Sequence, residues 1–307
     1  MMLEFVPQAM VLDERNQQLI VAGEHQQVQI LSLPEGQVVE QLATPMTTLT
    51  PLTTLALSRD GKVLVAGTKT GAVLLWQRDR ATEPWPTAVV KLSNPHDAAT
   101  LSVSITSSGD RVASASVDGS LRVWHKTASE QWQLLHQHDS AHRSMAVRTV
   151  QLMAGQDILV TGGDDHLIRL WDHSASQLQP LNNLMRNNHS PVHTLAVLPG
   201  DDSVVVGGAN GKIILKKINF RGEHYKQLFQ GQQGSTPIQA LAVNPDYLMV
   251  SGSVDRMVGF WDLCTDKTMQ VLGRHQKPVV AVAIDQSGQT VVSAGLDQTI
   301  QIWAEDE

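Results

Sequence analysis

Residues 158–172, ILVTGGDDHLIRLWD, decide the fold of this chain of 307 residues. Two short apolar runs, Ile158–Val160 and Leu167–Leu170, flank the polar turn Gly163–His166. Because β-branched residues favour strands and Gly and Asp favour a tight reversal, the stretch predicts a β-hairpin. Its second strand ends in Trp171-Asp172, and the same pattern returns along the whole chain.

The repeat emerges when the chain is aligned on the tryptophan of this hairpin. The aligned positions are Trp76, Trp124, Trp171, Trp261 and Trp303, with Leu31 and Lys216 at two degenerate ones. Their successive spacings are 45, 48, 47, 45, 45 and 42 residues. Each unit reads as an alternating apolar strand, a turn, a two-strand hairpin and, in most units, a more polar fourth strand such as Thr87–Leu92 or Gln133–His136.

Seven such units occupy residues 1–307 as a single domain. Four antiparallel strands cannot bury both faces of their sheet alone, so units of this length stack around an axis as a propeller. We therefore expect an all-β, seven-bladed β-propeller of four-stranded antiparallel blades. The expected blades are residues 5–43, 52–92, 99–137, 146–184, 191–230, 237–272 and 278–304.

The chain resembles the WD-repeat β-propellers, and a set of His, Ser or Thr, Asp and Trp at fixed offsets carries the resemblance. The complete sets are His96, Ser114, Asp118, Trp124; His142, Thr161, Asp165, Trp171; and His275, Ser293, Asp297, Trp303. The Trp261 unit keeps Ser251 and Asp255, with Gln233 near the expected His. In the family these four side chains form a hydrogen-bonded tetrad that supports each blade. The resemblance implies a fold and no particular activity, because propellers host many functions.

The His–Ser–Asp sets also contain the residue types of a nucleophilic triad. The set recurs three times, however, whereas a hydrolase needs one exposed nucleophile. The tetrad implied by the resemblance gives the hydroxyl a bridging position between His and Trp. The stretch Gly67–Gly71 has Lys and Gly but lacks the spacing of a phosphate-binding loop. We therefore expect no enzyme activity and no cofactor.

His136, His138, Asp139 and His142 form the densest group of potential metal ligands. His136 and His138 would share one face of a strand, because side chains alternate along it. A zinc site needs three or four convergent ligands, and the resemblance assigns His142 to a tetrad. We favour the absence of a metal, and the alternative of a site at His136, His138 and Asp139 stays open.

A protein partner is the expected ligand, bound by loops. In the family, the loops that connect blades and turn the central hairpins form the top, partner-binding face. These loops carry Lys69, Arg143, Arg148, Asp164, His166, His193 and Arg256. Arg pairs bidentately with carboxylates, so an acidic or polar segment suits this face. We expect roughly one in three of these residues to contact a partner and the others to be solvated.

Trp85 and Trp132 lie outside the tetrad positions, in connections after third strands, and Phe220, Tyr225 and Phe229 lie in the equivalent segment of the Lys216 unit. Trp and Tyr are enriched among interface anchors, so these residues are candidate partner contacts. An equally favoured interpretation is that Trp132 begins the fourth strand and packs on its own blade.

The last repeat reaches Trp303 at its third strand. In the family the N-terminus normally supplies the missing fourth strand. Here the first strand is expected near Pro7, which leaves Met1–Val6 for both strand and connection. We expect a last blade with three strands or a stub of a fourth, and an edge that can accept a partner strand by β-augmentation.

Composition narrows the class of protein. The net charge of −7, without a basic stripe, argues against nucleic-acid binding. Cys264 is the only cysteine, which fits a reducing compartment. The first residues lack signal-peptide features, and no apolar run approaches the roughly 20 residues that span a bilayer. We expect a cytoplasmic, non-enzymatic interaction scaffold within a multiprotein assembly; the alternative is a propeller whose central channel binds a small molecule or metal for sensing or catalysis.

Overall fold

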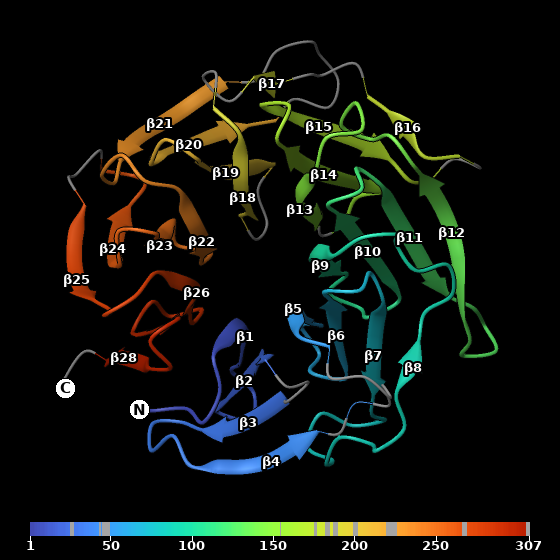
Figure 1. Cartoon of the computed structure of the whole chain (residues 1–307), viewed down its shortest axis with the longest axis horizontal. Helices are drawn as coiled ribbons and strands as arrows, with labels where there is room; N and C mark the ends of the chain where they lie inside the picture. The colour runs from blue at the N-terminus through green and yellow to red at the C-terminus, as the bar shows by residue number, and fades with distance from the viewer. Residues whose placement is uncertain are drawn as a thin grey trace.

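The computed structural model describes residues 1–24, 28–42, 44, 50–153, 155–174, 177–181, 185–186, 190–198, 202–218, 226–265 and 269–304. Its regular elements are β-strands, arranged in seven antiparallel sheets around a central opening (Figure 1). This confirms the predicted all-β, seven-bladed propeller. None of the described residues belongs to a helix with the length and hydropathy that crossing a bilayer requires.

We number the sheets as blades in chain order. Blade 1 holds β1 (Pro7–Asp13), β2 (Gln18–Gly23), β3 (Val28–Ser32) and β4 (Val38–Leu42); blade 2 holds β5 (Leu52–Leu57), β6 (Val63–Thr68), β7 (Val73–Gln77) and β8 (Val90–Lys91). Blade 3 holds β9 (Thr100–Ile105), β10 (Arg111–Ser116), β11 (Leu121–Lys126) and β12 (Trp132–His138). Blade 4 holds β13 (Val147–Leu152), β14 (Ile158–Gly163), β15 (Leu167–Asp172), β16 (Gln179–Pro180) and β17 (Met185–Arg186).

Blades 5 and 6 again have four strands, and blade 7 has three. Blade 5 holds β18 (Val192–Val197), β19 (Ser203–Gly208), β20 (Lys212–Lys217) and β21 (Lys226–Gln232). Blade 6 holds β22 (Ile238–Val243), β23 (Leu248–Ser253), β24 (Met257–Asp262) and β25 (Gln270–Arg274). Blade 7 holds β26 (Val279–Ile284), β27 (Thr290–Gly295) and β28 (Ile300–Ala304).

The opening stretch forms the central hairpin of blade 4. β14 and β15 pair in antiparallel register from Ile158 opposite Asp172 to Gly162 opposite Ile168. The turn between them requires a left-handed backbone at His166, whose φ is 67°. The predicted hairpin is therefore confirmed.

Apolar side chains on the strand faces hold neighbouring blades together. Between blades 2 and 3, for example, Leu75 belongs to one buried cluster with Val112 and Trp124. The first strands of successive blades also contact one another around the ring, and β26 contacts β1. Packing of Phe5 and the β2 residue Leu19 with residues of blade 7 closes the ring.

Residues 1–3 supply a stub at the fourth-strand position of blade 7. The Met1 ammonium donates to the carbonyl oxygen of Ile300 (2.9 Å), and the Ile300 amide donates to the carbonyl oxygen of Met1 (2.9 Å). The Leu3 amide donates to the carbonyl oxygen of Gln298 (2.7 Å). The expectation of a three-stranded last blade with a stub is confirmed.

One fourth strand is shorter than the sequence predicts. β8 covers only Val90–Lys91, whereas Thr87–Leu92 was expected. The preceding segment contains Pro84 and Pro86, which cannot donate to a strand ladder, and it packs toward blade 1 through Trp85.

Candidate partner-binding surface

The tetrad of blade 4 is a continuous chain of hydrogen bonds. The Trp171 indole donates to the Thr161 hydroxyl (2.8 Å), and that hydroxyl donates to Nε2 of His142 (2.8 Å). Nδ1 of His142 donates to Asp165 (2.7 Å), which also accepts from the Arg169 guanidinium. Thr161 therefore bridges two buried rings, which excludes it as a free nucleophile.

Charge and burial determine the protonation states of the His142 and Asp165 side chains. Burial lowers the pKa of His142, an effect that Asp165 partly opposes, so the imidazole is neutral at pH 7. Burial alone would raise the pKa of Asp165, but hydrogen bonds from His142 and Arg169 outweigh it and lower that pKa to about 2. Arg169 was not predicted as a member of this network.

Blade 3 departs from the predicted pattern. Nε2 of His96 contacts the Ser114 hydroxyl (2.6 Å), as expected. Nδ1 of His96, however, contacts the hydroxyl of Ser120 (2.6 Å), which in turn donates to Asp118 (2.6 Å). The indole of Trp124 donates to a main-chain carbonyl oxygen of the preceding connection rather than to Ser114. The four residues come together, but Ser120 is inserted between the His and the Asp.

Blade 6 contains Gln233 where the other sets have His. The Ser251 hydroxyl donates to Oε1 of Gln233 and accepts from the Trp261 indole (2.7 Å). Nε2 of Gln233 donates to the carbonyl oxygen of Met257 (3.1 Å). In blade 7 a histidine makes the corresponding bond: Nε2 of His275 contacts the Ser293 hydroxyl (2.7 Å). Gln233 thus substitutes for His in position and in its bond to the hydroxyl.

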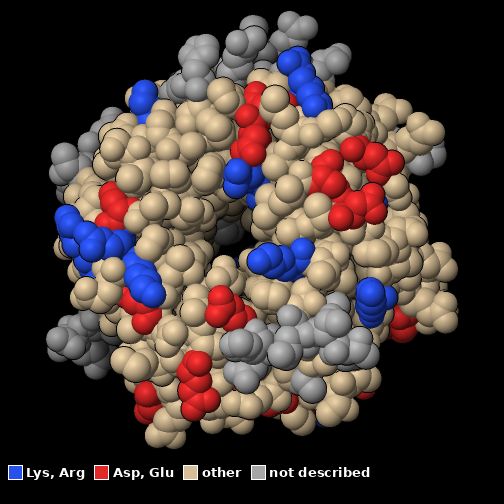
Figure 2. All heavy atoms as spheres, in the orientation of Figure 1, with Lys and Arg blue, Asp and Glu red and all other residues tan. Residues whose placement is uncertain are grey.

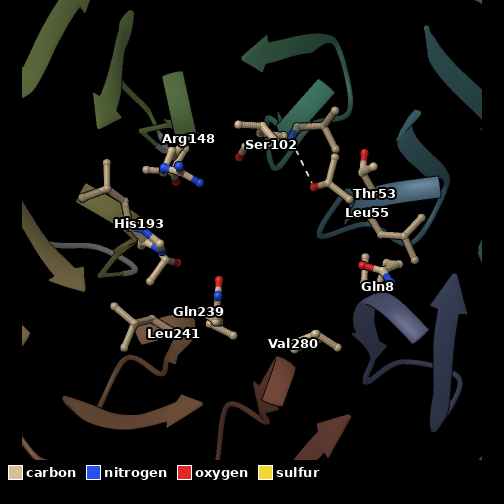
Figure 3. A pocket seen from close by; sticks show the side chains of 18 of the residues that line it. Gln8, Thr53, Leu55, Ser102, Arg148, His193, Gln239, Leu241 and Val280 are labelled. Atoms are coloured by element: carbon tan, nitrogen blue, oxygen red, sulfur yellow. Dashed lines mark hydrogen bonds between the residues drawn. The ribbon is translucent and has the colours of Figure 1, made fainter. Parts of the chain in front are cut away.

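The centre of the ring holds a cavity of about 410 Å³ lined mainly by the first strands of the blades. Arg148 and His193 lie on one side of it, near Gln239 (Figure 3). Nη2 of Arg148 donates to Oδ2 of Asp164 (3.0 Å), and Nε donates to the other carboxylate oxygen. Burial lowers the pKa of His193, and the nearby Arg148 lowers it further. The structure therefore brings together Arg148, Asp164 and His193, but Arg148 and Asp164 already pair with each other.

The other predicted loop residues do not converge on this cavity. Lys69, Arg143 and Arg256 are exposed and His166 is half-buried. Lys69 follows β6, whereas Arg256 precedes β24, and these blades lie on opposite sides of the opening (Figure 1). The face drawn in Figure 2 is hollowed at its centre, with basic side chains beside the opening and acidic groups around it.

Two exposed apolar residues of the loops were not predicted from the sequence as partner contacts. Val117 is 46% exposed in the hairpin turn of blade 3, and Met145 is 50% exposed in the connection from blade 3 to blade 4. The two segments pack together, because a Cβ atom on Gly119 would come within 3.0 Å of main-chain atoms of Ser144 and Met145. Apolar residues in otherwise polar loops were the sequence signal that could have identified them.

Trp85 is a correction to the sequence prediction. Its side chain is only 5% exposed, in the core between blades 1 and 2, so it is not a surface anchor. The Arg78 guanidinium lies 4.0 Å from the centre of the Trp85 ring, and the Trp85 main-chain amide donates to Oε1 of Glu40 (3.1 Å). The segment between β7 and β8 uses this tryptophan to attach to blade 1.

The remaining aromatic candidates among the described residues, Trp132 and Phe229, pack within the molecule. Trp132 begins β12, as the second interpretation expected, and is half-buried against the cluster between blades 2 and 3. Phe229 is buried, with its ring edge-to-face to Trp261 at 6.0 Å. Phe220 and Tyr225 lie outside the described residues.

The candidate metal ligands have separate partners. Nε2 of His136 donates to the carbonyl oxygen of His173 (3.0 Å), and the ring of His138 lies 5.1 Å from that of Trp171. Asp139 accepts from the side chain of Gln137 (2.8 Å). In the part of the chain that the structure describes, no group of three or more His, Cys, Asp or Glu residues is placed to hold a metal ion.

Comparison with known proteins agrees with this geometry. The WD domain, G-beta repeat, matches residues 89–125, 132–172, 224–262 and 266–304. The chain belongs to the WD-repeat family. Its four matched repeats contain the complete tetrads of blades 3, 4 and 7 and the Gln233 variant of blade 6.

Several curated WD-repeat relatives are longer than this chain. Protein ROOT INITIATION DEFECTIVE 3 of Arabidopsis thaliana is 26% identical over 69% of this chain and 48% of its own length. Cilia- and flagella-associated protein 52 of Sus scrofa is 26% identical over 80% of this chain and 37% of its own length. WD repeat-containing protein 36 of Homo sapiens is 24% identical over 64% of this chain and 22% of its own length. The alignments cover less than half of each of these relatives.

Proposed function

We propose that this protein is a non-enzymatic scaffold in a cytoplasmic multiprotein assembly, and that the loops of blades 3 and 4 bind a partner protein. WD-repeat proteins generally act as protein-interaction scaffolds. The tetrad hydroxyls and imidazoles, which carried the triad alternative, are engaged in structural hydrogen bonds.

The exposed pair Val117 and Met145 is the observation that carries this proposal. Exposed apolar side chains on loops that pack against each other are typical anchors of a protein interface. The loop before Met145 is held in a defined shape, since Arg143 and Ser144 have φ values of 54° and 62° and the Met145 amide donates to the carbonyl oxygen of His142 (2.9 Å). The tetrad residue His142 thus anchors the loop, and a pre-organised loop loses little conformational entropy on binding.

The partner suited to this surface combines an apolar group with a charged one. Arg143 is exposed two positions before Met145, and Arg148, which is paired with Asp164, lines the cavity. A segment with an apolar residue for Val117 and Met145 and a carboxylate for Arg143 would match both kinds of contact.

The test compares two double variants in quantitative affinity purification. Val117→Asp with Met145→Asp should remove specific partners, because aspartates would desolvate poorly in an apolar contact. The matched control is Val38→Asp with Val90→Asp, since these valines of β4 and β8 are similarly exposed, at 51% and 44%. Both proteins must keep the thermal unfolding midpoint of the parent. Equal partner profiles for the two variants would contradict the proposed surface.

The central cavity supports a second candidate, the binding of a small anion. Arg148 and His193 line it, and a ligand carboxylate could replace Asp164 at the guanidinium. Native mass spectrometry of the purified protein, with Arg148→Ala as the comparison, tests this candidate. A bound small molecule that disappears in the variant would favour it over the scaffold.

A further inference from the structure

We propose that the outer edge of β28 is a second binding site, which takes an extended segment of a partner polypeptide in the fourth-strand position of blade 7. This site lies apart from the loops of blades 3 and 4 and does not depend on them. Three observations support it: the hydrogen-bonding groups of the edge, the exposure of Trp303, and the groove beside the strand.

The edge presents the backbone N–H and C=O groups of Ile302, which no described residue bonds from outside the sheet. Ile300 directs its amide and carbonyl outward to Met1. Alternate residues of an antiparallel strand point these groups to the same side, so Ile302 also directs its amide and carbonyl outward. The stub forms its single bridge at Met2 and Thr299 and stops short of Ile302 among the described residues. An exposed edge of this kind is a template for strand addition.

The tryptophan of blade 7 is less covered than its counterparts. The equivalent side chains Trp76, Trp124, Trp171 and Trp261 are 0%, 0%, 2% and 3% exposed, whereas Trp303 is only half-buried. In blade 3 a fourth-strand residue, Leu134 of β12, lies opposite Trp124. A fourth strand with an apolar residue opposite Trp303 would remove this surface from water.

A groove runs beside the strand and indicates the charge of its occupant. Its volume is about 560 Å³, and its lining includes Pro34, Glu35, Ile302 and Trp303. The Met1 ammonium also lines it but donates to the carbonyl oxygen of Ile300, so the Glu35 carboxylate is the remaining charged group of the described lining. The occupant is therefore an extended segment with an apolar residue for Trp303 and a Lys or Arg for Glu35. A second copy would present the same described lining, which contains no Lys or Arg to pair with Glu35.

The experiment measures residue-resolved amide exchange of the full chain by NMR. The isolated protein should exchange the Ile302 amide roughly tenfold or more faster than those of Phe260 and Val123. These two residues hold the same place in β24 and β11 and are paired with β25 and β12. Equal protection of all three amides would overturn the proposal, since the edge would then be covered.

The probe is a synthetic peptide of the sequence Trp132–His136 with two lysines added before Trp132. In the register of β12, its Leu134 lies opposite Trp303 and its His136 opposite Ile302, clear of the Met1 stub. It should slow exchange at Ile302 roughly tenfold at saturation, and a peptide with Leu134→Asp, which puts a carboxylate opposite Trp303, should not. Slowing by both peptides, or by neither, would overturn the proposal.

Two further arms separate the remaining alternatives. Protection that rises with protein concentration without peptide, together with a dimer in native mass spectrometry, would assign the edge to a second copy and overturn the partner assignment. The Val117→Asp/Met145→Asp protein should bind the peptide as the parent does. A loss of binding there would show that the two surfaces are one site and would contradict the proposed independence.

Discussion

At the scale of single residues, the indole of Trp76 shows what a blade loses without its hydroxyl. This ring is fully buried, and no described residue accepts a hydrogen bond from its nitrogen. The residue ten positions earlier is Ala66, whereas Thr161 and Ser251 hold the same offset in blades 4 and 6 and accept from their tryptophans. Blade 2 therefore keeps the packing of the tryptophan and lacks its acceptor.

Replacing Ala66 by Ser should stabilise the protein by about 1 kcal/mol, because a buried indole N–H gains an acceptor. Ala113→Ser is the control, since that buried alanine lies beside Ser114 and not at the tetrad offset. Urea unfolding of the parent and the two variants measures the free energies. Equal effects of the two substitutions would contradict this account of Trp76.

The bridging hydroxyl of blade 4 can be tested in the opposite direction. Thr161→Val should cost roughly 2–4 kcal/mol of unfolding free energy, because His142 and Trp171 each lose a buried partner. His142→Gln should cost less than His142→Ala, since Gln233 already bonds the hydroxyl in blade 6. Chemical denaturation ranks the three variants, and a Gln variant as unstable as the Ala variant would refute the equivalence.

Sequence offsets predicted which residues meet in these tetrads but not every bond between them. The hydrogen bonds of blade 4 join the four predicted residues, whereas in blade 3 the Ser120 hydroxyl, and not Asp118, bonds Nδ1 of His96. An offset fixes the place of a side chain on the hairpin, and a neighbouring hydroxyl of suitable length can still compete for the same nitrogen.

At the scale of elements, the segment between β7 and β8 joins blade 2 to blade 1. Arg78 forms a buried ion pair with Asp13 (3.1 Å) and donates to the carbonyl oxygens of Gly61 and Glu83 (both 2.8 Å). Its guanidinium also covers the ring of Trp85. The sequence could not predict this arrangement, because Arg78 and Asp13 lie 65 positions apart and neither belongs to the repeated motif. The surface assignment of Trp85 was wrong for the same reason.

Arg78→Ala should destabilise the protein by about 3–5 kcal/mol, since it leaves the Asp13 carboxylate buried without its partner. The double variant with Asp13→Ala should cost less than the sum of the single variants. Arg80→Ala is the matched control, because its ion pair with Glu83 is solvent-exposed and is expected to contribute about 0–1 kcal/mol. Thermal and urea unfolding provide the measurement, and additive single effects would contradict the coupling.

At the scale of the whole molecule, the buried imidazoles make stability depend on pH. Burial, reinforced by Arg122, lowers the pKa of His96 from 6.5 to about 4. Between these values the unfolded chain binds the proton and the folded protein does not, so stability falls as pH decreases from 6.5 to 4. The pKa of Asp165 and that of Asp297 are each lowered from 3.8 to about 2, which adds a further loss below pH 4.

Urea midpoints measured between pH 7.5 and pH 3 should show this decline, with a plateau above about pH 6.5. The variant His96→Gln should flatten the part between pH 6.5 and 4, because glutamine does not titrate. An unchanged slope in that variant would show that other groups carry the dependence.

The closure of the ring also determines how it responds to mechanical load. Among the described residues, blade 7 and the N-terminal stub share three backbone hydrogen bonds at residues 1–3, and side-chain packing around Phe5 adds to them. A force applied between Met1 and Ala304 passes first through this seam, and the three inner strands of each other blade are joined by longer ladders. The ring should therefore open at low force between blades 7 and 1, and the remaining blades should yield later, one sheet at a time.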